Sequence, residues 1–511
     1  MPASLLGTAP WRSWRELVLV AGLGALHSLP MVWTALWWLQ LLVVGLLAWR
    51  SAAVSPRRAA LLGLVFGTAW QAAGTWWLFI SMHRYGGLPA WMAVAAVLAL
   101  SAFLASYVAA ALAAFARWRS GQALADALLW AALWLLAELA RALLFTGFPW
   151  VASGHAHVDG PLAALAPWLG VYGIGAVAAF LSAWLALAAT RSLRGAALPL
   201  ICAAAVLLGL RLAGTAQFSA PTGTLSVTLL QGNVAQDEKF SIAHMPQALA
   251  WTSAQLLAAP SDLVVGPETV VPLLPEQLDP AYWQPLLAHF RAPGRAALIG
   301  IPLGNENVGY TNSVIGVSAA TAGAHDGFYR YDKHHLVPFG EFIPWGFRWF
   351  TEMMNIPLGD FNRGPVEAPS FSVKGERIAP NICYEDLFGE ELAGRFADAA
   401  LAPTIFANIS NIGWFGDTIA IAQHRNISRL RSLEFQRPML RATNTGATVV
   451  IDHLGHVTAA LAPHTRGVLD AQVQGRSGLT PYARWASLAG LWPLLLLALA
   501  TVVALARRRR P

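Results

Sequence analysis

Three short stretches of the sequence carry side chains that could cooperate in nucleophilic catalysis. Cys383 stands at the end of an apolar run, Glu268 follows another such run, and Lys333 lies in a stretch punctuated by glycine and proline. A cysteine attacks an acyl carbonyl as a thiolate, so it requires a base or cation nearby and donors for the oxyanion that forms. A carboxylate and an ammonium group beside the thiol would meet these needs. The three stretches therefore predict attack of a cysteine on an acyl carbonyl.

Each of these side chains also has a plain structural interpretation. A cysteine at a strand end is more often a small core residue than a nucleophile, and single glutamates and lysines mostly lie at the surface. Their coincidence at predicted strand ends favours a functional site. Glu341, eight residues after Lys333, is a second carboxylate that could position the lysine and keep it charged.

The composition indicates that much of the chain faces lipid. The 511 residues are 56% hydrophobic and only 12% charged, and they include 23 tryptophans. A soluble globular protein cannot bury that much apolar surface. The apolar residues fill the first two hundred positions and the last segment, while the middle resembles an ordinary soluble domain. The sequence predicts an integral membrane protein with one extramembrane domain.

Eight stretches approach the roughly 20 apolar residues that a spanning helix needs. They are residues 14–28, 30–49, 59–80, 88–116, 123–145, 161–190, 196–213 and 485–506. If the N-terminus is cytoplasmic, arginines fall in every loop on that side and in the C-terminal tail, whereas the opposite loops are nearly uncharged. This bias predicts a membrane domain over 1–216, an extracytoplasmic domain over 217–484, and a last helix with a basic cytoplasmic tail over 485–511.

The distribution of charge, cysteine and histidine argues against a nucleic-acid partner, a disulfide and a metal site. The net charge of +7 comes from short clusters between apolar runs, so it indicates membrane topology and no nucleic-acid partner. Cys202 lies in an apolar run, so a disulfide with Cys383 is not expected. Histidine pairs at 155/157, 334/335 and 453/456 lack a third convergent ligand, and no metal site is predicted. A monomer is the default expectation.

The middle domain shows short β-branched runs between helical patterns. Predicted strands cover 225–230, 263–265, 297–301, 313–317, 378–383, 404–409 and 448–451, and predicted helices cover 244–257 and 419–435. A layered α/β domain accommodates this order. In the fifth predicted span, Glu138 and Arg141 lie on one helix face, either as a structural pair or as part of a functional site.

The three stretches resemble a known family. Pro-Glu-Thr around Glu268, Tyr-x-Lys-x-x-Leu-Val-Pro-Phe-Gly-Glu around Lys333 and Cys-Tyr-Glu from Cys383 are similar to the Glu-Lys-Cys triad of the nitrilase superfamily. The predicted spans and the Phe-Thr-Gly-Phe-Pro-Trp motif at 145–150 narrow the resemblance to the apolipoprotein N-acyltransferases of bacterial inner membranes. It extends through residues 408–416, 441–446 and 479–482.

The resemblance implies an α-β-β-α sandwich in the periplasm and a two-step transfer. A phospholipid would donate its sn-1 acyl chain to Cys383, and the thioester would acylate the α-amino group of a lipoprotein's diacylglyceryl-cysteine. Glu268 would be the base and Lys333 the oxyanion stabiliser, and no cofactor is implied. The implied supporting or substrate-binding residues are Glu341, Tyr384, Glu385, Phe240, Trp150 and Trp414.

Three positions depart from the family pattern. Phe240 and Gly266 stand where tryptophan is usual, and Ile412 replaces an aspartate. No triad member is lost, so altered contacts are expected but not lost chemistry. The aromatic run 345–350, followed by Met353 and Met354, is either a lipid-facing lid or core packing.

Two other functions remain open on the sequence. A membrane-anchored amidase or nitrilase would use the same triad and complete the second step with water. A noncatalytic lipid-binding scaffold would have no reason to retain all three triad residues. The apolar spans favour a lipid substrate, because lifting acyl chains into water costs about 0.8 kcal/mol per CH₂.

Overall fold

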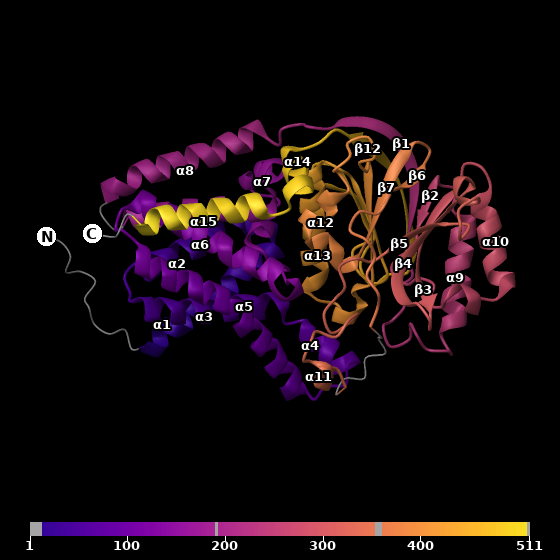
Figure 1. Cartoon of the computed structure of the whole chain (residues 1–511), viewed down its shortest axis with the longest axis horizontal. Coiled ribbons are helices and arrows are strands. Elements are labelled where there is room, and N and C mark those ends of the chain that lie inside the picture. The colour runs from indigo at the N-terminus through magenta and orange to yellow at the C-terminus, as the bar shows by residue number, and fades with distance from the viewer. Residues whose placement is uncertain (1–12, 190–192, 353–359, 508–511) are drawn as a thin grey trace.

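A computed structural model describes residues 13–189, 193–352 and 360–507. It shows a helical half on the left of Figure 1 and an α/β half on the right. The chain builds the helical half first, then the α/β half, and returns to the helical half with its last helix.

The helical half follows the apolar stretches of the sequence. Its helices are α1 (Ser13–Ser28), α2 (Trp37–Ser51), α3 (Pro56–Thr75), α4 (Leu78–Ile80), α5 (Ala90–Trp118), α6 (Ala123–Leu143), α7 (Ala166–Ala189), α8 (Leu193–Ala213) and α15 (Trp492–Arg507). Glu16 near the start of α1 forms ion pairs with Arg50 and Arg58. Some arginines that set the predicted topology therefore also tie neighbouring helices together.

The predicted count of eight spans is confirmed only in part. Within the described ranges, five helices are long and apolar enough to cross a membrane, or up to six if the bent pair at the C-terminus counts as one span. Two of the other predicted spans are short or polar at one end: α1 has 16 residues, and α3 begins with Pro56, Arg57 and Arg58.

The last predicted span is two helices. The structure has α14 (Pro481–Ala489) followed by α15, and the two axes are turned by 87°. Gly490 lies between them with φ of 52°, a left-handed conformation that glycine adopts without steric cost. Trp485 therefore belongs to a helix that lies across the end of the last span.

The α/β half is a sandwich of two six-stranded sheets. The first has the order β12-β1-β2-β3-β4-β5 and the second β11-β10-β9-β8-β7-β6. The strands are β1 (Ala220–Gln231), β2 (Leu263–Val265), β3 (Ala296–Asn305), β4 (Gly309–Ser318), β5 (Tyr329–Asp332), β6 (Phe371–Val373), β7 (Glu376–Ile382), β8 (Ile405–Ser410), β9 (Met439–Thr443), β10 (Val449–Ile451), β11 (Val457–Ala460) and β12 (Gly467–Ser477).

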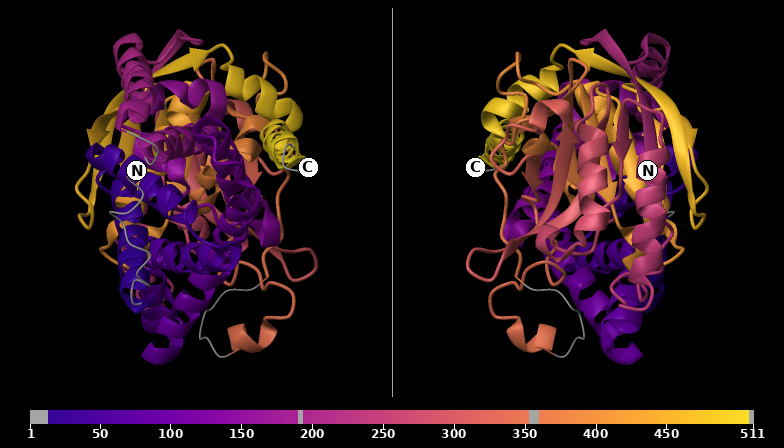
Figure 2. Two further views of the ribbon diagram at one scale, coloured as in Figure 1. Left: turned by 90° about the vertical axis from the view of Figure 1, so that its left-hand side faces the viewer. Right: turned by 90° about the vertical axis from the view of Figure 1, so that its right-hand side faces the viewer.

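Helices cover both outer faces of the sandwich. Helices α9 (Met245–Ala258) and α10 (Pro280–Arg291) lie on the face turned away from the helical half, which the right view of Figure 2 presents. Helices α12 (Gly389–Gly394) and α13 (Ile419–Phe435) lie between the second sheet and the helical half. The predicted α-β-β-α layering is thereby confirmed, and both sheets are buried because helices cover them.

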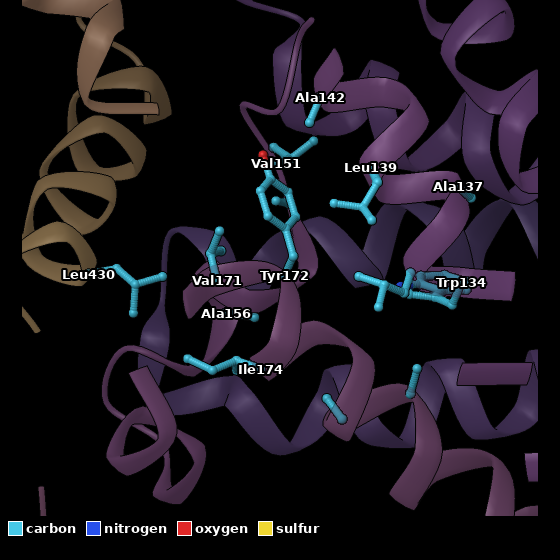
Figure 3. Close-up of a cluster of buried hydrophobic side chains, with 14 of the residues drawn as sticks. Trp134, Ala137, Leu139, Ala142, Val151, Ala156, Val171, Tyr172, Ile174 and Leu430 are labelled. Atoms are coloured by element: carbon cyan, nitrogen blue, oxygen red, sulfur yellow. The ribbon is translucent and has the colours of Figure 1, made fainter. Parts of the chain in front are cut away.

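One hydrophobic core crosses the boundary between the two halves. Val171 and Ile174 on α7 belong to the same buried cluster as Leu430 on α13. Figure 3 shows Leu430 facing Val171 across the boundary. The second layer of the sandwich is therefore packed directly on the helical half.

Candidate active site

Strand directions bring the three predicted catalytic residues to one edge of the sandwich. Strands β1, β2 and β3 are parallel, and β5 runs parallel to β3 because two antiparallel pairings separate them. Glu268 lies just past the end of β2, and Lys333 directly follows β5. Cys383 directly follows β7, which is parallel to β8 in the facing sheet. All three therefore lie at carboxyl ends of strands.

The chain turns sharply at Cys383. This residue has φ of 53° and joins β7 to the 3₁₀ helix Cys383–Leu387. A left-handed conformation in a residue other than glycine costs of order 1–3 kcal/mol and is typical of functional sites. Asn408 Nδ2 and His424 Nε2 each lie 3.1 Å from the Cys383 carbonyl oxygen and hold the turn. The strained conformation is thus fixed by two buried side chains.

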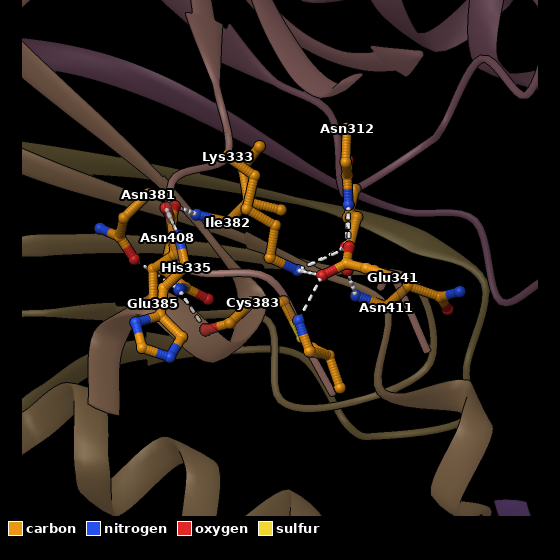
Figure 4. Close-up of polar contacts among 12 residues, drawn as sticks. Asn312, Lys333, His335, Glu341, Asn381, Ile382, Cys383, Glu385, Asn408 and Asn411 are labelled. Atoms are coloured by element: carbon orange, nitrogen blue, oxygen red, sulfur yellow. Dashed lines mark hydrogen bonds and ion pairs between the residues drawn. The ribbon is translucent and has the colours of Figure 1, made fainter. Parts of the chain in front are cut away.

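Lys333 lies between two carboxylates. Its Nζ is 2.9 Å from the Glu341 carboxylate and 3.5 Å from Glu268 Oε1. Asn312 Nδ2 donates to both carboxylates, at 2.7 Å each. Figure 4 shows Lys333, Asn312 and Glu341 pointing toward one another. The buried ammonium group is therefore paired, as a charge in a protein interior must be.

Burial and charge set the protonation states. Burial would raise the pKa of Glu268, but Lys333 and Lys239, with hydrogen bonds from Asn312 and the Asn411 amide, hold it below its usual value. Burial opposes the charge of Lys333, yet Glu341 and Glu268 raise its pKa. Burial, and then Glu268, raise the pKa of the Cys383 thiol to about 12 against the opposing effect of Lys333.

These shifts define what the site can do. At neutral pH it holds a carboxylate, an ammonium group and a neutral thiol. Because the thiol is neutral, a reaction through its sulfur would need a proton acceptor, and the Glu268 carboxylate is the candidate. Lys333 could then stabilise the negative oxygen that attack on a carbonyl carbon produces.

Glu385 organises the nucleophile turn and the lysine segment together. Its carboxylate accepts hydrogen bonds from the backbone N–H of Ile382 at 2.6 Å and of His334 at 2.7 Å, and from the Tyr331 hydroxyl at 2.7 Å. Ile382 precedes the nucleophile and His334 follows Lys333. Glu385 therefore fixes the relative positions of Cys383 and Lys333.

Tyr384 links the site to the helical half. Its hydroxyl donates to the Gly147 carbonyl oxygen at 3.0 Å, within the aromatic motif after α6. Its ring stacks on Trp150 at a centroid distance of 6.5 Å. Trp150 Nε1 in turn donates to Gln423 on α13 at 2.9 Å. Trp150 thus belongs to the contact between the halves.

Replacing Tyr384 with phenylalanine is expected to weaken this contact. The change keeps the ring but leaves the buried Gly147 carbonyl unpaired, which should cost about 1–3 kcal/mol of stability. Thermal unfolding of the purified protein measures the loss. Tyr329→Phe is the matched control, because the Tyr329 hydroxyl bonds Pro369 near the surface. Equal effects of the two changes would contradict a special role for the Tyr384 bond.

The other predicted aromatic residues are less buried. Phe240 is 41% exposed, and Trp414 contacts Tyr85 edge-on at 5.7 Å. Of the aromatic run 345–350, Trp345 is almost fully exposed, whereas Phe350 packs against Leu88 and its neighbours. Packing therefore accounts for Phe350, the lid stays a prediction, and Met353 and Met354 lie outside the described residues.

Two of the three departures have a packing explanation. A Cβ atom at position 266 would lie only 2.9 Å from Val270 Cγ1, which is too close for two carbon atoms. The packing around Gly266 therefore suits glycine. Ile412 is fully buried in the large core that also contains Leu430. Both substitutions therefore fit their surroundings.

Three residues at the site were not predicted from the sequence. Asn312 bridges the two carboxylates, the Asn411 amide donates to Glu268 Oε2 at 2.8 Å, and Lys239 Nζ donates to the Glu268 carbonyl oxygen at 2.8 Å. Lys239 adjoins Phe240, which was singled out. A second buried cation beside Glu268 could have been inferred only from knowing that this loop reaches the site.

Polar residues of the helical half form a separate buried cluster. Glu138 accepts hydrogen bonds from the Ser153 amide at 2.8 Å and its hydroxyl at 2.7 Å, and Arg141 lies 3.4 Å away. This arrangement favours the structural interpretation of the pair. Across the described residues, no group of three potential metal ligands occurs.

Two family models together cover most of the chain. One, described as the apolipoprotein N-acyltransferase N-terminal domain, matches residues 23–184, and the other, described as carbon-nitrogen hydrolase, matches residues 226–482. The fold and site are thus those of a carbon-nitrogen hydrolase domain attached to a half built of apolar helices.

Whole-length relatives narrow this class. The apolipoprotein N-acyltransferase of Verminephrobacter eiseniae is 54% identical, covering 96% of this chain and 94% of its own. That of Ralstonia nicotianae is 47% identical, covering 96% and 93%. The chain belongs to the apolipoprotein N-acyltransferase family. Among solved structures, a CN-hydrolase superfamily protein from Xanthomonas campestris is similar with a TM-score of 0.36 and 20% identity, covering 54% of this chain and 97% of that one.

Proposed function

We propose that the chain moves the sn-1 acyl group of a phospholipid to the α-amino group of a lipoprotein's diacylglyceryl-cysteine. The observation that carries this proposal is the bond from Tyr384, next to the nucleophile, to Gly147 at the end of an apolar helix. It ties the thiol to the part of the molecule that contacts lipid. Family membership supports acyl transfer to a nitrogen of an apolipoprotein, since the relatives are named for that reaction.

In the first step, the Cys383 thiol gives its proton to Glu268 while its sulfur bonds the ester carbonyl carbon. Lys333 stabilises the oxyanion. The ester C–O bond then breaks, and the departing lysophospholipid alkoxide takes the proton from Glu268. Cys383 is left as a thioester.

In the second step, the α-amino nitrogen attacks the thioester carbonyl and the C–S bond breaks. The amine proton returns to the thiol through Glu268. Glu341, Glu385 and Tyr384 position these groups, while Phe240, Trp150 and Trp414 would contact substrate or its entry path. No cofactor is required because the ester already carries the acyl group in an activated form.

The proposed setting is the bacterial inner membrane. Eight spans would cross it, counting α1 and α3, with both termini cytoplasmic and the catalytic domain, residues 217–484, in the periplasm. The membrane domain would cover 1–216, and 485–511 would hold the last span and its basic tail. The protein would act as a monomer.

A transfer assay separates this function from its rivals. Purified protein would be incubated with phospholipid vesicles labelled in the sn-1 chain and a diacylglyceryl-cysteine peptide. We expect the peptide mass to rise by one labelled acyl chain as lysophospholipid forms. Labelled free fatty acid without a peptide mass change would instead establish a hydrolase, and no product of either kind would favour a scaffold.

A further inference from the structure

Lys239 is a second buried lysine beside the triad. Although lysine side chains are seldom fully buried, Lys239 is only 6% exposed. Its Nζ donates to the backbone carbonyl oxygen of Glu268 at 2.8 Å. The chain's lysines are Lys239, Lys333 and Lys374, against a large excess of arginine. Lysine is thus rare in this protein and is concentrated at the site.

The loop that carries Lys239 is fixed to the same residues that hold Glu268. The backbone N–H of Asn411 donates to Glu268 Oε2, and the Asn411 side-chain Nδ2 donates to Gln236 Oε1, each at 2.8 Å. Asn444 exchanges hydrogen bonds with Val234, at 3.0 and 2.8 Å. Lys239 is therefore held in place by the framework that positions the base.

A charge count shows what this lysine contributes. Among the four charged groups that contact Glu268 or Lys333, the carboxylates of Glu268 and Glu341 at rest balance the ammonium groups of Lys333 and Lys239, while the Glu385 carboxylate is separately held by backbone and tyrosine donors. When Glu268 accepts the thiol proton and the oxyanion forms, one negative charge replaces another and the sum stays at zero. Without Lys239, the buried group would carry one uncompensated negative charge in both states, which is costly in a low-dielectric site.

We propose that Lys239 is a positioning residue of the acyl transfer, which holds the Glu268 backbone and keeps the buried site electrically neutral while the thioester forms. This inference rests on the proposed function. It assigns to Lys239 an electrostatic role that acts through Glu268, distinct from the oxyanion contact of Lys333.

The pH dependence of Cys383 acylation tests the proposal. Burial lowers the pKa of Lys239 to about 8, against the opposing charges of Glu268 and Cys383. Because the ammonium form is the functional one, the single-turnover acylation rate of the wild-type protein should fall as pH rises through about 8. Intact-protein mass spectrometry after mixing with labelled phospholipid vesicles gives this rate.

Two variants distinguish the electrostatic role from a structural one. Lys239→Arg keeps its charge at all accessible pH values, so the alkaline fall should move beyond the measured range. Lys239→Met should show no alkaline fall near pH 8, and the fall of its rate at acid pH should begin at a higher pH, because Glu268 loses a nearby cation that lowers its pKa. Lys374→Met is the matched control, since Lys374 is half-exposed and pairs with Asp262.

The outcomes are separable from those of the proposed function. A wild-type protein that acylates Cys383 with no fall near pH 8, or a Lys239→Arg protein with the wild-type profile, would overturn the role of Lys239 while leaving acyl transfer intact. Absence of wild-type acylation would overturn the proposed function itself. If Lys239→Met fails to fold, Lys239→Arg alone decides.

Discussion

Cys383→Ser is expected to lower the rate of acyl-enzyme formation by about four orders of magnitude or more, the scale seen when a catalytic nucleophile is removed. A serine hydroxyl is a far weaker acid than a thiol, and Glu268 is held below its usual pKa, so the carboxylate is too weak a base to activate it. The similar size of serine should leave the fold intact. Intact-protein mass spectrometry after incubation with labelled phospholipid would measure acylation.

Cys202→Ser provides the matched control. Cys202 lies on α8, outside the α/β half, and is likewise a free cysteine. Its replacement should leave acylation at the wild-type rate. Full peptide acylation by the Cys383→Ser protein would show that the thiol is not the acyl carrier.

Glu268→Gln is expected to slow acylation of Cys383 by roughly 10²- to 10⁴-fold, the usual contribution of a general base. Both oxygens of Glu268 accept hydrogen bonds, Oε1 from Asn312 Nδ2 and Oε2 from the Asn411 amide. A glutamine would place an NH₂ group against one of these donors, so local displacement adds to the loss of the base. The rate is again read by mass spectrometry.

Glu376→Gln is a suitable control for burial of a carboxylate. Glu376 is also buried, and it accepts hydrogen bonds from Thr222 Oγ1 at 2.8 Å and the Gly223 amide at 2.6 Å. Its replacement should destabilise the fold without slowing acylation by the folded protein. A Glu268→Gln protein that loads acyl groups at the wild-type rate would remove Glu268 from the base role.

The parts of the fold that the sequence predicted correctly have strong local patterns. The apolar run at β2 is bounded by Asp262 and Gly266, and the structure begins and ends the strand inside those limits. The pattern over residues 419–435 likewise matches α13 at both ends. The predicted strand 378–383 ran one residue too far, because Cys383 leaves the strand in a left-handed turn.

Strands β9 and β12 were not predicted from the sequence. Strand β9 is buried throughout and its apolar residues are interrupted by Arg441, whereas β12 alternates Leu469, Ala471 and Val473 with the exposed Asp470, Gln472 and Gln474, a pattern that could have predicted a strand. Arg441 Nη1 is satisfied by Ser428 at 2.7 Å and Asn408 at 3.0 Å, contacts between residues distant along the chain. A buried arginine in a strand is stable only when the folded sandwich supplies these hydrogen-bond partners.

The candidate site was predicted as a set of residue types but not as a network. The motifs identified Glu268, Lys333 and Cys383, and strand directions explain why they meet. Asn312 lies within a strand and Lys239 within a loop, and neither belongs to a recognisable pattern. Their roles depend on which segments meet beside Glu268 in the folded chain, which the order of residues alone does not specify.

The continuous core from α7 to α13 has a consequence for how lipid reaches the thiol. Since Leu430 shares a buried core with Val171 and Ile174, the sandwich is packed directly on the apolar helices. The height of Cys383 relative to those helices is accordingly a fixed property of the fold. If the thiol takes its acyl group from a phospholipid as proposed, the donor ester would have to reach that level, and lipids whose esters lie shallower or deeper in the bilayer would react at different rates.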